Sequence, residues 1–204
     1  MSTPSTPLAL YGRSRGVPAT LAALGCAALL TLWMASRPDF YLDPDRRVPL
    51  LSLAPLLASA AIGVSLHSHT RDLDDTAVRP WWPRRLTHLL LLTALAATAL
   101  ALALPGNSQV FGAAGMVRNT LGATGLTALS AVLCGARVSW LPTTLYFSAV
   151  YFSASAPRMR ARTALTWPLQ SGPQLGAWAV ALALFVIGTA LYAGRGARPE
   201  GPRA

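Results

Sequence analysis

Uncharged stretches of bilayer length alternate with short charged segments along this chain. A helix needs about 20 predominantly apolar residues to cross the ~30 Å hydrocarbon core of a bilayer. Six stretches reach or approach that length, five of them uncharged and the fourth with Arg118 near its start, and they cover residues 17–36, 48–66, 86–104, 113–135, 138–155 and 175–193. The pattern predicts an all-α fold, a polytopic transmembrane helical bundle of about six spans within residues 17–193.

Prolines at the second stretch and glycines at the fourth raise questions of local structure. Pro49 stands at the start of the second stretch and Pro55 lies inside it, where neighbouring helices in a membrane can absorb a kink. The fourth stretch carries Gly112, Gly115, Gly122 and Gly125, whose small surface lets another helix approach closely. We therefore predict a fourth span packed inside the bundle, with a re-entrant hairpin as the alternative.

Arg118 and Asn119 fall where the fourth span should enter the bilayer. An ionisable group within a span is costly and tends to face the bundle interior. With Tyr146 and Tyr151 of the fifth span, these residues are candidates for lining a transport pathway. The alternative for Arg118 is that its side chain extends to the head groups, because long cationic side chains near a helix end commonly do so.

Residues 67–85 form the most densely charged interruption between the apolar stretches. The segment is either a solvated connector anchored by aromatic residues or a docking segment for another subunit, since mixed charges and aromatic side chains suit an interface. The candidate docking residues are Arg71, Asp72, Asp74, Asp75, Arg79, Trp81 and Trp82.

Composition supports a membrane location. Residues are 53% hydrophobic and 12% charged, about half the roughly 25% charged residues of soluble domains. The net charge is +10, and every basic residue is Arg. These residues form no continuous patch with interleaved aromatics, which disfavours nucleic acid as a partner. Anionic lipid head groups are the more natural counterions.

Motifs for self-contained chemistry are absent from the sequence. The chain has no GxxxxGK[ST] phosphate loop, no HExxH zinc helix and no GxSxG nucleophile turn. His67 and His69 lack a metal-ligand spacing, and Cys26 and Cys134 lie in apolar runs. We therefore expect no enzyme activity, no cofactor and no metal site, and we expect His88 to form a hydrogen bond near the membrane interface.

Arginine counts near the span ends suggest an orientation. A cytoplasmic N-terminal segment, residues 1–16, places ten arginines inside and seven outside the plasma membrane. If residues 108–136 did not cross, the sixth span would reverse and residues 158–162 would become cytoplasmic. The Gly- and Pro-rich tail, residues 194–204, is expected to be disordered.

Three sequence patterns carry a resemblance to known proteins. They are RNTLGxxGL from Arg118, CGARxxWLP from Cys134 and WPLQ from Trp167. Over residues 86–193 they resemble small actinobacterial polytopic membrane proteins that are ABC-transporter-associated or permease-like. In layout the chain also resembles six-span permeases of ABC exporters, whose loop between spans two and three contacts the nucleotide-binding subunit, although residues 67–85 contain no Glu.

The resemblance implies a membrane subunit of an ABC-type exporter, working as a homo- or hetero-oligomer such as a homodimer with separate ATPase subunits. Residues 67–85 would be its coupling segment. The alternative is a non-transporting accessory or immunity protein that anchors a partner in the membrane. A membrane enzyme is a third hypothesis, and it would require a pair of carboxylates or histidines at membrane depth.

Overall fold

The computed structural model describes residues 16–36, 44–67, 81–104, 112–153, 165–170 and 172–199, with side chains described only from residue 51 in the second range and to residue 152 in the fourth. These residues form six α-helices and one 3-10 helix, and no strand occurs among them. The elements are α2 (Val17–Ala35), α3 (Pro44–Ser65), α5 (Trp82–Leu102), α6 (Gly112–Cys134), α7 (Trp140–Ser153), η2 (Trp167–Leu169) and α9 (Leu175–Arg195).

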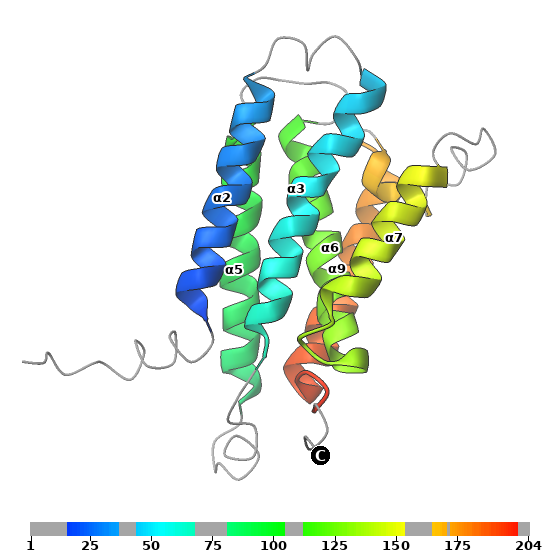
Figure 1. The fold of residues 1–204 in the computed structure, drawn as a ribbon. Coiled ribbons are helices and arrows are strands. Elements are labelled where there is room, and N and C mark those ends of the chain that lie inside the picture. Colours follow the sequence, from blue (N-terminus) through cyan, green and yellow to red (C-terminus); the bar gives the residue numbers. More distant parts are fainter. Residues whose placement is uncertain are drawn as a thin grey trace, which may run out of the picture.

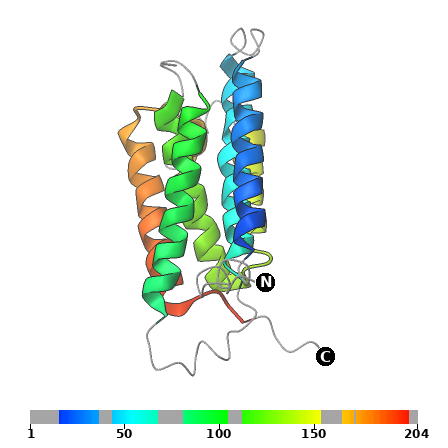
Figure 2. The same cartoon turned by 90° about the vertical axis from the view of Figure 1, so that its left-hand side faces the viewer.

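The helices form an upright bundle in which neighbours along the chain run in alternating directions (Figures 1 and 2). Helix α6 contacts α3, α5, α7 and α9, and its contact with α9 is the most extensive in the bundle. Helix α2 packs on α3 and α5. The bundle is therefore built around α6, and α2 lies at its periphery.

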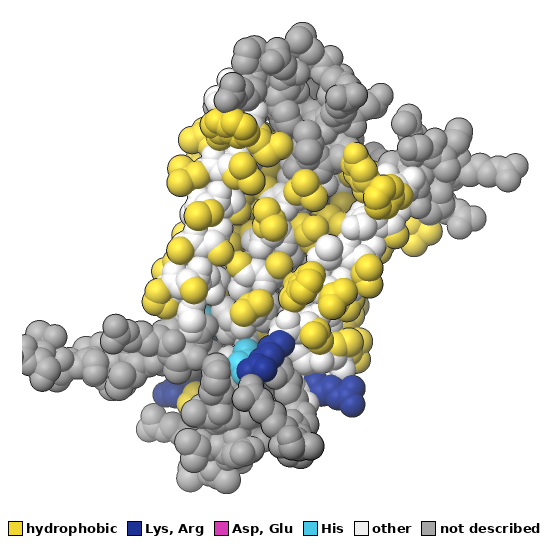
Figure 3. All heavy atoms as spheres, viewed as in Figure 1, with side chains coloured by type: hydrophobic (Ala, Val, Ile, Leu, Met, Phe, Trp, Pro, Cys, Tyr) yellow, Lys and Arg dark blue, Asp and Glu magenta, His cyan; other side chains and the backbone are white. Residues whose placement is uncertain are grey.

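The outer surface of the bundle is apolar, while its central helix α6 buries mainly small and polar residues. Leu29, Leu91 and Leu175 are exposed, the last at 84%. The buried residues of α6 include Gly, Ala, Thr and Ser. Figure 3 shows hydrophobic side chains along the length of the visible face. Water-soluble bundles show the opposite distribution, because their apolar stripe faces the core.

Three helices, α2, α5 and α9, are long and apolar enough to cross a membrane. Helix α3 contains a shorter apolar segment, Leu51–Ser65. Because lipid can solvate the exposed Leu side chains and water cannot, the chain is a membrane-associated helical bundle. The all-α class predicted from the uncharged stretches is confirmed.

The fourth stretch forms one continuous helix, so the re-entrant hairpin is wrong. Gly125 explains how α6 reaches the centre of the bundle. A Cβ at Gly125 would overlap the backbone of Leu184 and Phe185, and a Cβ at Gly188 would overlap the Gly125 carbonyl. The backbones of α6 and α9 therefore touch where both helices have glycine, which is how small residues permit close packing in membranes.

Several helix ends differ from the predicted stretches. Helix α3 begins at Pro44 and continues through Pro49, so Pro49 does not start it. Pro44 has no amide hydrogen to donate and suits the first helical position. Helix α7 has 14 residues, about 21 Å at 1.5 Å per residue and shorter than a full span. The predicted continuation to residue 155 lies outside the described residues.

The end of the charged segment and the beginning of the tail are also more ordered than expected. Helix α5 begins at Trp82, with Pro83 in its first positions, so part of the predicted connector is helical. Helix α9 includes Gly194 and Arg195. Beyond it, the Arg198 amide donates to the Ala131 carbonyl at 2.8 Å. The disorder expected for residues 194–204 is therefore wrong for 194–199, and 200–204 lie outside the described residues.

Candidate functional site

A buried guanidinium near the start of α6 is the centre of the first candidate site. Arg118 is 0% exposed. Its Nη2 donates to the Gln170 carbonyl at 2.8 Å, and its Nε donates to Asn119 Oδ1 at 3.1 Å. The side chain is thus held inside the bundle, and the interpretation that it extends to the head groups is wrong. The short segment around η2 supplies the acceptor, the Gln170 carbonyl.

The segment of residues 165–170 provides two backbone carbonyls that its own turn leaves unused. Leu169 and Gln170 donate to the carbonyls of Thr166 and Trp167. The Pro168 carbonyl then accepts from Asn119 Nδ2 at 2.7 Å. Buried carbonyls need partners, and the adjacent Arg118 and Asn119 of α6 provide them. We name this set, Arg118, Asn119, Thr166, Pro168 and Gln170, the Arg118 clamp; Gln170 Nε2 completes it by donating to Thr166 Oγ1 at 2.8 Å.

Trp167 fixes the same segment through apolar contacts. Its ring is 1% exposed. It meets Phe147 edge to face at a centroid distance of 5.8 Å and stacks on Tyr146 at 6.5 Å. A Cβ at Gly122 would overlap the Trp167 indole, so Gly122 leaves the space that the ring occupies. Tyr146 Oη donates to the Leu165 carbonyl at 2.7 Å. Residues 165–170 are therefore fastened to both α6 and α7.

The predicted pathway residues separate into two groups. Arg118, Asn119 and Tyr146 all bind the 165–170 segment. Tyr151 is 51% exposed and packs against Phe152 on the outer surface of α7. The structure thus brings three of the four residues together and leaves Tyr151 apart. Their role in a pathway stays a prediction.

The Arg118 clamp is suited to fastening, not to proton transfer. The two acceptors of Arg118 that the structure describes are a neutral amide oxygen and a carbonyl oxygen. No acidic residue occurs among the side chains that the structure describes. An Arg side chain does not deprotonate at ordinary pH, so the guanidinium can orient neighbouring carbonyls but cannot act as a general acid.

The second candidate site is the end of the bundle where α3 finishes and α5 starts. We name it the arginine end, because all the arginines other than Arg118 whose side chains the structure describes lie there: Arg84, Arg85, Arg137, Arg195 and Arg198. Arg46 and Arg47 belong to the start of α3 at the opposite end, and their side chains are not described. Figure 3 shows Arg side chains gathered at this lower end of the visible face. The start of α2 and the end of α9 lie at the same end (Figure 2).

Hydrogen bonds hold the helices together at the arginine end. Ser65 Oγ lies 3.2 Å from His88 Nε2, which joins α3 to α5. Tyr192 Oη donates to the Leu66 carbonyl at 3.4 Å. Arg198 Nη1 donates to the Leu133 carbonyl at 3.0 Å. His88 therefore forms a hydrogen bond as expected, to a buried serine of the neighbouring helix.

The predicted docking segment is only partly described. Arg71, Asp72, Asp74, Asp75 and Arg79 lie outside the described residues. Trp81 is the N-cap of α5, and Trp82 is the first helical residue and is 52% exposed. The Arg84 guanidinium lies 4.8 Å from the centroid of the Trp81 ring, in cation–π geometry. The two tryptophans thus belong to the start of a helix.

Arg84 and Arg85 stand where helix stability alone would not place them. They occupy the first turn of α5, whose dipole disfavours positive charge. Exposure to a membrane surface offers a different reason, because juxtamembrane arginines bind anionic head groups. Their position therefore favours a role at the membrane interface.

Within the described part of the chain, no three His, Cys, Asp or Glu side chains gather as metal ligands would. Cys26 and Cys134 are free and exposed on the bundle surface. No protein-family model, curated protein or solved structure matches this chain. Its function must therefore be argued from the bundle itself.

Sequence reasoning missed Thr166 and Gln170 as members of the clamp. A signal was present in the polar pair Arg118 and Asn119, because a buried pair of donors requires acceptors elsewhere in the chain. Pro168 marks a place where a regular helix is interrupted and carbonyls are left over. Joining the two signals would have predicted the contact.

Proposed function

We propose that this chain is the permease-like membrane subunit of an ABC-type exporter, whose six-span layout it resembles. Separate ATPase subunits would bind the arginine end through residues 67–85. One observation carries the proposal. Apart from the buried Arg118, the arginines whose side chains the structure describes share one end of the bundle, and the connection between α3 and α5 begins and ends there, at His67 and Trp81.

Charge supports a cytoplasmic location for this end. Arginine-rich flanks of membrane helices remain on the cytoplasmic side. In this orientation α2 starts from the cytoplasm, and the bundle is a multi-pass protein of the plasma membrane. The acidic residues Asp72, Asp74 and Asp75 then lie on a connection that starts and ends in an arginine-rich surface. A partner with a complementary mixed surface would be guided to one orientation.

The packing of α6 bears on where a substrate would pass. The glycine contact between α6 and α9 leaves no space between these helices at Gly125. A route through the centre of one chain would require the Arg118 clamp and this contact to open. A route between two copies of the chain would not, and the proposal therefore includes a dimer.

The same clamp favours a second candidate, a non-transporting accessory or immunity protein that anchors a partner. Arg118 and Asn119 make hydrogen bonds to carbonyls of a segment that is far away in sequence. Each such bond stabilises one arrangement of helices, whereas alternating access needs two. The two candidates therefore differ in whether the clamp must open.

Cysteine labelling tests the orientation. Single cysteines are placed at Thr76, in the α3–α5 connection, and at Asp39, in the α2–α3 connection, with Cys26 and Cys134 replaced by Ser. A membrane-impermeant maleimide applied to intact cells should label the cysteine at position 39 and leave that at position 76 unlabelled until the cells are opened. The reverse pattern would place the arginine end outside and overturn the proposal.

Neutralising the acidic residues tests docking. The triple substitution of Asp72, Asp74 and Asp75 by Asn should reduce recovery of an ABC-type ATPase with the tagged chain and its ATP hydrolysis in reconstituted vesicles. Asp39→Asn with Asp43→Asn is the matched control, because it removes acidic charge from the opposite connection. Equal recovery with both variants would remove the coupling role. If the ATPase is recovered with the chain but its ATP hydrolysis does not depend on the chain, the result would favour the accessory protein.

A further inference from the structure

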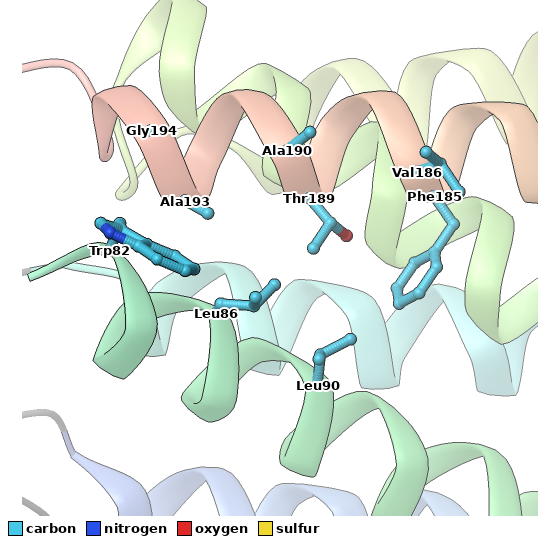
Figure 4. A pocket seen from close by; sticks show the side chains of 9 residues that line it. All are labelled: Trp82, Leu86, Leu90, Phe185, Val186, Thr189, Ala190, Ala193 and Gly194. Atoms are coloured by element: carbon cyan, nitrogen blue, oxygen red, sulfur yellow. The ribbon is translucent and has the colours of Figure 1, made fainter.

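A lateral groove separates α5 from α9 at the arginine end (Figure 4). Its volume is about 510 Å³. Trp82, Leu86 and Leu90 of α5 form one wall, and Phe185, Val186 and Ala190 are on the other. The two helices are antiparallel, so Trp82 marks the mouth and Phe185 the inner end. The groove is apolar and opens on the surface that faces lipid.

Thr189 places an unused hydroxyl in this apolar groove. The residue is 6% exposed, and its Oγ1 has no hydrogen-bond partner. Several threonines in these helices donate to the carbonyl four residues earlier, as Thr31, Thr93 and Thr120 do. Thr124 of α6 also lacks a partner, but it does not line the groove. Figure 4 shows the Thr189 side chain between the two helices. A buried hydroxyl without a partner is costly, so an acceptor on a bound molecule would satisfy it.

The depth of the groove matches one leaflet of a bilayer. Its lining spans residues 82–90 on α5 and 185–194 on α9, which is about 12 to 14 Å at 1.5 Å per residue. Half of a ~30 Å hydrocarbon core is about 15 Å. An acyl chain entering at the mouth would therefore fill the groove to its inner end.

Arginines are close in sequence to the residues that line the mouth. Gly194 lines the groove and is followed by Arg195. Trp82 lies in the same helical turn as Arg84 and Arg85. Arg84 and Arg195 are exposed. The mouth therefore combines an interfacial tryptophan with guanidinium groups that bind phosphate well.

We infer that the α5–α9 groove binds an anionic phospholipid. One acyl chain lies along Leu86, Leu90 and Phe185, and the phosphate group contacts arginines at the mouth. The Thr189 hydroxyl donates to an ester carbonyl of the lipid, about 9 Å along α9 from Arg195. A second copy in the same membrane orientation would bring its own arginine end to the same level, and like charges would oppose that contact.

Photo-crosslinking in nanodiscs of phosphatidylcholine tests this site on the full chain. Two probes are compared, phosphatidylglycerol and phosphatidylcholine, each with a diazirine on one acyl chain. Labelled peptides are mapped by mass spectrometry. We expect the phosphatidylglycerol probe to label peptides of α5 and α9 several times more strongly than the phosphatidylcholine probe. Both lipids carry a phosphate, but the choline cation offsets its charge, whereas an anionic head group gains about 1 kcal/mol for each nearby arginine.

Three variants distinguish an effect on the groove from an effect on folding. Ala190→Phe fills the groove and should abolish the preferential labelling. Ala183→Phe adds the same ring at an exposed position of α9 that does not line the groove, and should leave the labelling unchanged. Thr189→Val should reduce labelling by about twofold to tenfold, as expected for one lost hydrogen bond, while the lipid-free protein keeps or raises its melting temperature.

Three results would overturn the inference. Equal labelling by the two probes would show that the mouth does not select anionic head groups. Unchanged labelling in Ala190→Phe, with the variant folded, would place the lipid elsewhere. A cross-link between two copies through α5 and α9 in wild type, lost in Ala190→Phe, would identify a second copy as the occupant.

Discussion

The two ends of the bundle use arginine in opposite ways. Near one end, Arg118 is fully buried and fixed by oxygens of Asn119 and Gln170. At the other, Arg84, Arg137 and Arg195 are exposed at helix ends. The same side chain fastens the helices in the first place and presents charge to the surroundings in the second. Position relative to the packed helices decides between these roles.

The two ends of the bundle also differ in how closely their elements pack. Residues 165–170 fold back onto α6 and α7, and Trp167 fills the space beside Gly122. At the arginine end, α5 and α9 diverge and leave the groove lined by Trp82 and Thr189. Within the described residues, one end is therefore packed by the 165–170 segment, while an apolar groove remains between two helices at the other.

Removing Arg118 should have the largest effect. Arg118→Ala leaves the Gln170 carbonyl without this donor and creates a cavity, and the loss of folding free energy should be about 3 kcal/mol. Thermal unfolding in detergent, followed by near-ultraviolet circular dichroism, measures the change. Arg137→Ala at the arginine end is the matched control and should change the free energy by less than about 0.5 kcal/mol.

Equal melting temperatures for Arg118→Ala and Arg137→Ala would contradict the contrast between the two ends. Arg118→Lys sharpens the test. Lysine keeps the charge but lacks the planar fork that reaches two acceptors, so it should recover only part of the lost stability. Full recovery would mean that charge alone, and not the geometry of the clamp, holds residues 165–170.

Filling the space beside Trp167 should have an intermediate effect. Gly122→Ala places a methyl group against the indole, and overpacking of this kind costs about 1–3 kcal/mol. Trp167→Phe removes the ring atoms that the methyl would meet, so the double variant should be less destabilised than the sum of the two single variants. Strictly additive melting shifts would show that Gly122 and Trp167 are not coupled.

Loosening the end of the chain should have the smallest effect. Arg198→Ala removes the hydrogen bond to the Leu133 carbonyl, while the backbone bond to Ala131 remains. We expect a loss of about 0.5–1 kcal/mol in the same unfolding experiment, because one exposed hydrogen bond contributes no more. Faster hydrogen exchange restricted to residues 194–199 would locate the change. Exchange spreading into α6 would indicate a larger role for this contact.

The sequence predicted the helices better than their ends. Runs without charge were sufficient to place α2 and α9, because charge is costly within a bilayer, whereas α6 also contains Arg118. Helix α5 begins earlier than predicted because Trp81 and Pro83 form a helix start inside a segment whose charges suggested a loop. Helix α3 likewise includes the arginines that were taken as its boundary.

The candidate sites also differ in whether the sequence could predict them. The arginine end could be predicted from the sequence, since it follows from the order of spans and charges. The Arg118 clamp could not, because it joins Asn119 to Pro168 across 49 positions of the chain. The α5–α9 groove also depends on which helices become neighbours, which the apolar pattern leaves open.

The sequence by itself determined that this chain is an all-helical bundle with an apolar exterior, because the lengths of its uncharged runs and the scarcity of charge allow little else. Only the tertiary structure decided that Arg118 is a buried fastener and that Thr189 faces a groove. The physical reason is that hydropathy is a property of each segment, whereas hydrogen-bond partners and gaps between helices exist only once α6 and α9 have packed on Gly125 and Gly188.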